Sequence, residues 1–80
     1  MSIEIDEKSN KVVIGLNKDL YDIDSIKNCA EDFSRLCTAK VRSNGKVRVI
    51  LEAKGEADIS TLGHEFCNYL LAFMKNNNKV

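Results

Sequence analysis

The chain has 80 residues, 44% apolar and 30% charged, and its 12 cationic side chains balance 12 acidic ones. This length and composition predict one globular domain and exclude a disordered chain. A formal net charge of zero argues against binding to nucleic acid or membrane through an overall field. The sequence has no run of about 18 apolar residues, so we expect no membrane span.

The first ten residues and the cysteines predict the compartment. The opening stretch MSIEIDEKSN has acids where a secretory signal would have a cationic start and an apolar run. The cysteines are odd in number and lie in segments of helical pattern: Cys29, Cys37 and Cys67. We therefore expect reduced, packed thiols and a cytoplasmic protein.

Two alternating segments at the start predict a hairpin. Ile3 and Ile5 would share one face of a first strand, and Val12, Ile14 and Leu16 would share one face of a second. The stretch EKSN between the two segments has the composition of a turn.

After the predicted hairpin, the spacing of the apolar residues changes from that of a strand to that of a helix. Apolar residues step by three and four along one face, at Ile23, Ile26, Ala30, Phe33 and Cys37. Asp22 is the predicted N-cap, because its carboxylate can accept hydrogen bonds from the free N–H groups of the first turn. These features predict an ordinary amphipathic helix.

A second hairpin is predicted around Asn44-Gly45, a pair that tolerates positive φ. One face would carry small and branched apolar residues, namely Ala39, Val41, Val47, Val49 and Leu51. The other face would carry four cations, which we call the basic quartet: Lys40, Arg42, Lys46 and Arg48.

Asp58 is the predicted cap of a second helix, from Ile59 to about Lys75. The order is therefore ββαββα, and the expected fold is a single α+β domain over residues 1–76 with a flexible C-terminal tail at 77–80. We expect one small sheet with both helices packed on one face. The second and third strands could be joined by a right-handed parallel crossover.

The second helix is apolar over a wider arc than packing on a sheet requires. A core stripe of about 100° would contain Leu62, Phe66, Tyr69, Leu70 and Phe73. Two interpretations account for the remaining apolar flank: the first helix covers it, or it binds a partner or a second copy. The expected protein-contact residues are Cys67, Asn68, Leu71 and Met74.

No catalytic, metal or cofactor site is predicted. His64 and Cys67 are three apart, but a structural zinc site normally takes four ligands, and no second pair is spaced to complete it. Cys67 lies in an apolar stripe, where the pKa of its thiol should rise and its reactivity fall. The glycines are scattered and form no phosphate loop.

The basic quartet could bind phosphates or an acidic peptide. It has no interleaved aromatic residue, so a base-stacking platform is not expected. The alternative is a solvated face whose cations are balanced by Glu4, Asp6 and Glu52. The first strand is also a candidate sheet edge, which could accept a strand from another peptide.

From about Val12 to Lys75 the chain resembles the HxsD family, small proteins of the His-Xaa-Ser peptide systems. The stretches LNKDLYDIDSIKNCAEDF and EFCNYLL carry the resemblance. The matching positions are Leu16, Tyr21, Asp22, Ile26, Ala30 and Phe33, followed by Phe66, Asn68 and Leu71. Two departures are Glu31, where an aromatic residue is expected, and the lack of an arginine after the second helix.

The resemblance implies a non-catalytic accessory subunit that binds a protein or peptide. Its partner would be a radical S-adenosylmethionine enzyme or the precursor peptide of that enzyme, and the chain lacks the enzyme's C-x3-C-x2-C signature. A homodimer through the second helix fits this expectation. A weaker resemblance, carried by VILEAKGEADISTLGHEFCNYL, is to the small dimerising subunit of the KEOPS tRNA-modification complex. It supports the alternative of a nucleic-acid-associated subunit that uses the basic quartet.

Overall fold

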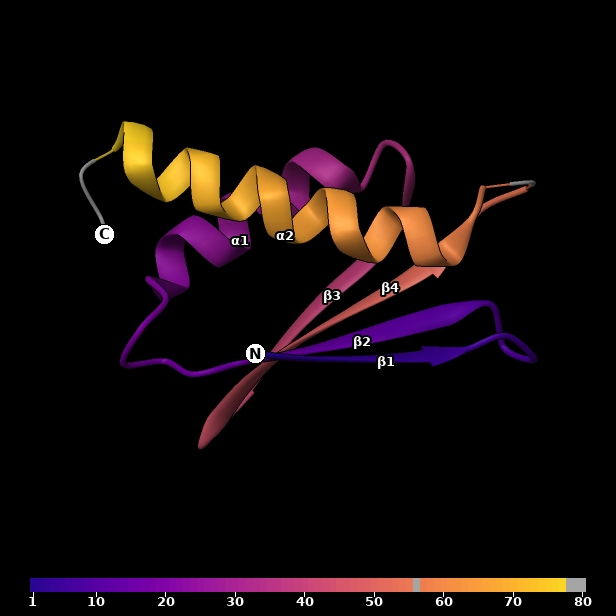
Figure 1. The fold of residues 1–80 in the computed structure, drawn as a ribbon, viewed down its shortest axis with the longest axis horizontal. Coiled ribbons are helices and arrows are strands. Elements are labelled where there is room, and N and C mark those ends of the chain that lie inside the picture. Colours follow the sequence, from indigo (N-terminus) through magenta and orange to yellow (C-terminus); the bar gives the residue numbers. More distant parts are fainter. Residues whose placement is uncertain (56, 78–80) are drawn as a thin grey trace.

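The computed structural model describes residues 1–55 and 57–77. Its elements follow the predicted order and confirm an α+β fold with one sheet and two helices (Figure 1). The elements are β1 (Ser2–Asp6), β2 (Lys11–Leu16), α1 (Ile23–Phe33), β3 (Cys37–Asn44), β4 (Lys46–Ala53) and α2 (Ile59–Asn76).

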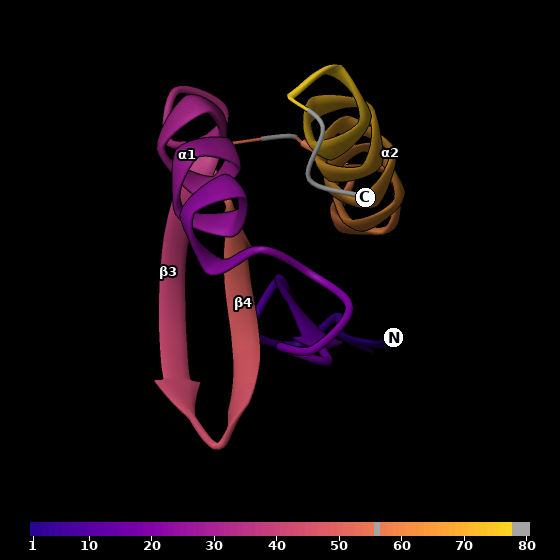
Figure 2. The ribbon, with the colours of Figure 1, turned by 90° about the vertical axis from the view of Figure 1, so that its left-hand side faces the viewer.

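The four strands form one antiparallel sheet in the order β1-β2-β4-β3. Strands β2 and β3 therefore run parallel, but β4 lies between them, so the connection through α1 crosses over a strand instead of joining neighbours. Both helices lie on the same side of the sheet, as Figures 1 and 2 show. The opposite face carries no helix in the described part of the chain.

The first hairpin has the predicted faces. Ile3 pairs with Ile14 and Ile5 pairs with Val12, so these four side chains project toward the helices. In the turn, the carboxylate of Asp6 accepts two hydrogen bonds from backbone N–H groups, at 3.1 and 3.3 Å. These bonds hold the reversal between β1 and β2.

The second hairpin turns at Gly45, whose φ is +80°. Asn44 pairs directly with Lys46, so Gly45 alone occupies the bend and supplies the positive φ. Along the strands, Ala39 lies opposite Leu51 and turns toward the helices, as predicted. The tip of this hairpin extends away from the helix layer (Figure 2).

Helix α1 begins at the predicted cap. The Asp22 carboxylate accepts from the Ser25 N–H at 3.0 Å and from the Ser25 hydroxyl at 2.8 Å. The helix ends at Phe33, with Ser34 as its C-cap, so the expected continuation to Cys37 is wrong. Cys37 instead starts β3, where its buried thiol donates to the Phe33 carbonyl at 3.4 Å.

Helix α2 has a cap at each end. Asp58 accepts from the Ser60 N–H at 3.0 Å, which confirms the predicted start. Asn77 donates its backbone N–H and its side-chain amide to the Phe73 carbonyl, at 3.1 and 2.8 Å. The predicted flexible tail therefore includes one residue that closes the helix, and 78–80 lie outside the described residues.

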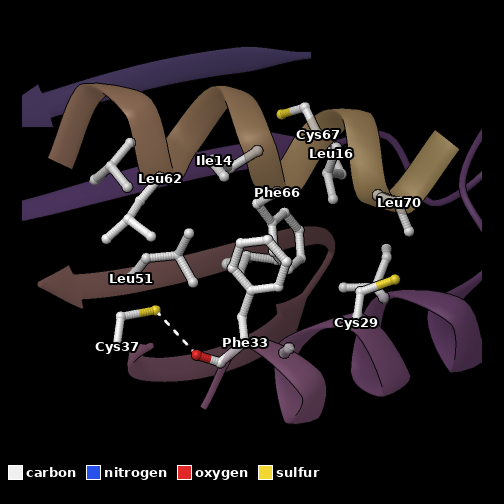
Figure 3. Close-up of a cluster of buried hydrophobic side chains, with 14 of the residues drawn as sticks. Ile14, Leu16, Cys29, Phe33, Cys37, Leu51, Leu62, Phe66, Cys67 and Leu70 are labelled. Atoms are coloured by element: carbon white, nitrogen blue, oxygen red, sulfur yellow. Dashed lines mark hydrogen bonds between the residues drawn. The ribbon is translucent and has the colours of Figure 1, made fainter. Parts of the chain in front are cut away.

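The core fills the space between the helices and the sheet face beneath them (Figure 3). At its centre the rings of Phe33 and Phe66 meet edge to face, with centroids 5.2 Å apart. Gly63 lets α2 approach β2 closely, because a Cβ there would be 3.2 Å from a Val12 methyl group. The strands contribute Val12, Ile14, Leu16, Val47, Val49 and Leu51, all buried.

Candidate functional site

The buried face of α2 is rotated relative to the predicted one. Cys67 and Met74, expected on a partner-binding flank, are buried in the core. Tyr69, expected in the core, is 40% exposed, and Phe73 is only partly buried. The expectation that Cys67 and Met74 are free for a partner is therefore corrected.

Tyr69 lies at the margin of the core because its hydroxyl needs a polar partner. The hydroxyl donates to the Asp32 carboxylate at 2.6 Å, and the ring lies 5.5 Å from that of Phe33. Donation to this carboxylate raises the pKa of the Tyr69 phenol. Tyr69 therefore joins α2 to α1.

The other two predicted contact residues, Asn68 and Leu71, are exposed on the outer flank of α2. Leu71 is 46% exposed, which makes it one of the large apolar side chains left uncovered. The structure thus keeps half of the predicted contact set accessible.

The thiols are unsuited to nucleophilic chemistry. Burial raises the pKa of Cys29 to about 11, and the nearby charge of Asp32 adds to the rise. Burial also raises the pKa of Cys37 and of Cys67. All three thiols therefore stay protonated near neutral pH, where thiolate chemistry is slow.

His64 and Cys67 do not form a site. The Cys67 thiol donates to the Met1 sulfur at 3.3 Å, whereas His64 is exposed. In the part of the chain that the structure describes, no cluster of three or more His, Cys, Asp or Glu side chains could hold a metal ion.

The uncovered face of the sheet holds the basic quartet, which confirms that these cations share one face. Arg42 pairs directly with Arg48, and Lys40 lies opposite Ile50. We call this surface the open face. It is formed by Ser2, Glu4, Asp6, Lys11, Val13, Gly15, Thr38, Lys40, Arg42, Asn44, Lys46, Arg48, Ile50 and Glu52.

The predicted neutralisation by nearby acids is only partial. Lys11 and Glu52 form an ion pair at 3.7 Å across β2 and β4. Over residues 1–55 and 57–77, no member of the basic quartet forms an ion pair. Like charges placed opposite each other, as at Arg42 and Arg48, are unfavourable and favour an anionic partner.

The open face is hollowed beside the quartet. A depression of about 500 Å³ extends from β1 to Arg42 of β3. Val13 and Ile50 form its half-buried apolar floor. Gly15 leaves space there, because a Cβ at this position would lie 2.6 Å from the Ser2 hydroxyl. No described strand carries an aromatic residue, so bases have nothing on which to stack.

No described helix is long and apolar enough to cross a membrane. The motif positions behind the HxsD resemblance have clear structural roles: Asp22 caps α1, and Ile26, Ala30 and Phe33 are buried. These are packing and capping positions. No family model, curated protein or solved structure matches the chain.

Proposed function

We propose that this chain is a non-catalytic subunit that binds an acidic, extended segment of a partner protein on its open face. The observation that supports this proposal is the basic quartet, which lies beside an apolar floor and forms no ion pair among the described residues. The protonated thiols and the lack of a metal-ligand cluster in the same residues favour binding over catalysis.

Arg42 and Arg48 are the main anchors in this proposal. A guanidinium can donate two parallel hydrogen bonds to one carboxylate, which gives geometric specificity as well as attraction. An extended segment alternates its side chains between two directions. A segment that crosses the strands between the row of Arg42 and Arg48 and the row of Val13 and Ile50 would meet both rows. Acidic residues at every second position would then reach the arginines, and the apolar residues between them would contact Val13 and Ile50.

The acids of the open face would orient the bound segment. Glu4 and Asp6 lie on β1, at the opposite edge of the open face from Lys40 and Arg42 on β3. Like-charge contacts suppress wrong arrangements at an interface. A segment with its carboxylates over β1 would therefore be disfavoured.

A nucleic-acid partner is the alternative and fits the open face less well. Bases would find no aromatic side chain on the described strands, and a phosphate backbone crossing the sheet would meet Glu4, Asp6 and Glu52. A short acidic segment can keep to the basic side, whereas a long polyanion cannot.

The resemblance to HxsD proteins suggests which partner would supply the segment. It would be the precursor peptide of a His-Xaa-Ser system or the radical enzyme that modifies that peptide. Three unpaired, buried cysteines support a reducing compartment, so we place this role in the cytoplasm.

Fluorescence anisotropy tests the proposal, with a labelled peptide of alternating glutamate and valine as the probe. We expect saturable binding that weakens with salt. Arg42→Glu and Arg48→Glu should each reduce the affinity by at least about tenfold, because each reverses a charge in direct contact. Lys27→Glu is the matched control, since Lys27 is an exposed cation on α1.

Two results would contradict the proposal. The first is an absence of binding at low salt, and the second is an equal loss of affinity in Lys27→Glu and Arg42→Glu. Tighter binding of a labelled oligouridylate, with a steep salt dependence and the same loss in Arg42→Glu, would assign the open face to nucleic acid.

A further inference from the structure

The second surface of interest is the edge of the sheet at β1. Among the described strands, β1 pairs only with β2, so the backbone groups along its outer side have no strand beside them. Ile3 and Ile5 project toward the helix side, and Ile5 is 43% exposed there. The edge strand therefore presents both free backbone groups and apolar side chains.

Helix α2 continues this apolar surface. A Cβ at Gly63 would lie 3.7 Å from an Ile3 methyl group, and one turn later Cys67 contacts Met1. The helix thus runs antiparallel to β1, and Leu71 follows Cys67 by one more turn on the same flank. Ile5, Ile3, Met1 and Leu71 form a row that we call the apolar strip.

The other edge of the sheet differs in charge. β3 carries Lys40 and Arg42, both exposed, at the centre of its length. Two β3 strands paired antiparallel would bring these cations together, which is unfavourable. Exposed cations are a common protection of a sheet edge against pairing. β1 carries no cation between Ser2 and Asp6, and its exposed acids, Glu4 and Asp6, lie opposite like charges only in some registers.

We infer that β1 pairs antiparallel with β1 of a second copy, so that the chain forms a homodimer with one continuous sheet. The two-fold axis would pass through Ile3, placing each Met1 opposite the partner's Ile5. All these side chains lie on the helix side, where the two apolar strips would cover each other. Such an interface is isologous and closed, and it uses one patch twice.

Charge selects this register over the neighbouring one. With the axis at Ile3, Glu4 lies opposite the partner's Ser2, and no like charges lie directly opposite each other. With the axis at Glu4, two carboxylates would lie directly opposite each other, which destabilises a sheet. The apolar strip and the acids of β1 therefore favour the same pairing.

Sedimentation velocity of the full chain over a range of concentrations measures the association. We expect a monomer–dimer equilibrium that Leu71→Asp weakens by at least about tenfold, because each copy would bury a charge beside the partner's strip. Leu36→Asp is the matched control, since Leu36 is 53% exposed in the α1–β3 connection, away from β1. A wild-type chain that is monomeric at every concentration would overturn the inference.

Disulfide cross-linking tests the register without relying on Leu71. Ser2 and Glu4 lie on the open face, whereas the native thiols are buried and their pKa values are raised. Under mild oxidation, a mixture of Ser2→Cys and Glu4→Cys chains should form a covalent dimer, and neither variant alone should do so. Cross-linking of Glu4→Cys alone would contradict the Ile3-centred register.

This dimer is independent of the proposed peptide binding. Arg42→Glu should keep the dimer and lose the acidic peptide, whereas Leu71→Asp should lose the dimer and keep the peptide. Equal loss of both properties in both variants would overturn the assignment of two separate surfaces.

Discussion

The covered and open faces of the sheet are made by alternate residues of the same strands, yet they have opposite character. On β4, Leu51 is fully buried under the helices, whereas its neighbour Ile50 lies half-buried on the open face. Arg48 and Glu52 flank Ile50 along that face. The difference indicates that the covered face determines the stability of the fold, whereas the open face is available for the peptide binding that we propose.

The largest expected effect breaks the covered face. Leu51→Ala should lower the free energy of unfolding by about 2–5 kcal/mol, because it leaves a cavity in a close-packed core. Ile50→Ala, one position away, should lower it by less than about 1.5 kcal/mol, since Ile50 is half-buried and no described helix or strand packs over it. Urea denaturation of both variants measures the difference. Equal losses would refute the distinction between the two faces.

Thiol reactivity separates the core beneath the helices from the open face, because a thiol in the core differs in protonation and in access to solvent. Burial raises the pKa of Cys29 from 9.0 to about 11, so the thiolate is about a hundredfold scarcer near neutral pH. Lys40→Cys would place a thiol on the open face, and iodoacetamide should modify it first. The rate at Cys29 should rise as the pH approaches 11, and mass spectrometry can follow both sites. Rapid modification of Cys29 at pH 7 would contradict its burial.

A charge reversal on the open face should change recognition alone. Arg42→Glu is expected to shift the free energy of unfolding by no more than about 0.5 kcal/mol, because Arg42 is exposed and forms no ion pair among the described residues. The same variant should lose about tenfold in affinity for the acidic peptide. A large loss of stability would show that the quartet supports the fold.

The smallest effect concerns the cap of α2. Hydrogen bonds from Ser60 and Thr61 hold the pKa of Asp58 below 3.8. Because the pKa of Asp58 is lower in the folded chain than in the unfolded chain, its ionised carboxylate stabilises the folded state at pH values above the unfolded pKa. This stability is lost as the pH falls through the folded pKa. Asp58→Ala should lower the melting temperature by roughly a few degrees at pH 7 and by less near pH 3. Glu65→Ala, on the same helix, is the control for removing one exposed charge.

The local parts of the fold could be predicted from the sequence. The alternation of apolar and polar residues predicted the faces of both hairpins, and Asp22 and Asp58 predicted the helix starts. These features could be predicted because each depends on residues that are close together in the chain. The end of α1 was missed because Cys37 continues the helical apolar spacing while its backbone belongs to β3. The strand order depends on long-range pairing, which no local pattern contains.

The candidate surfaces were predicted only in part. The sequence indicated the width of the apolar arc on α2. It did not indicate which part of that arc is buried, because this depends on the neighbours of Tyr69, whose hydroxyl donates to Asp32. Two signals could have predicted which part of the arc is buried: the hydroxyl of Tyr69, which needs a polar partner, and the usual burial of cysteine. The exposure of Ile5 follows from the edge position of β1, which the sequence indicated only as a candidate, because the strand order has no local signal.

The central place of β4 has a consequence for how the chain folds during synthesis. Among the described strands, one ladder joins the two hairpins, and it pairs Lys11–Leu16 of β2 with residues 47–52 of β4. The first hairpin and α1 can form early, but β2 has no second partner strand until Ala53 has left the ribosome. Closing this distant ladder requires a large loop, which costs entropy before any contact is gained. We therefore expect the β2–β4 pairing to set the folding rate.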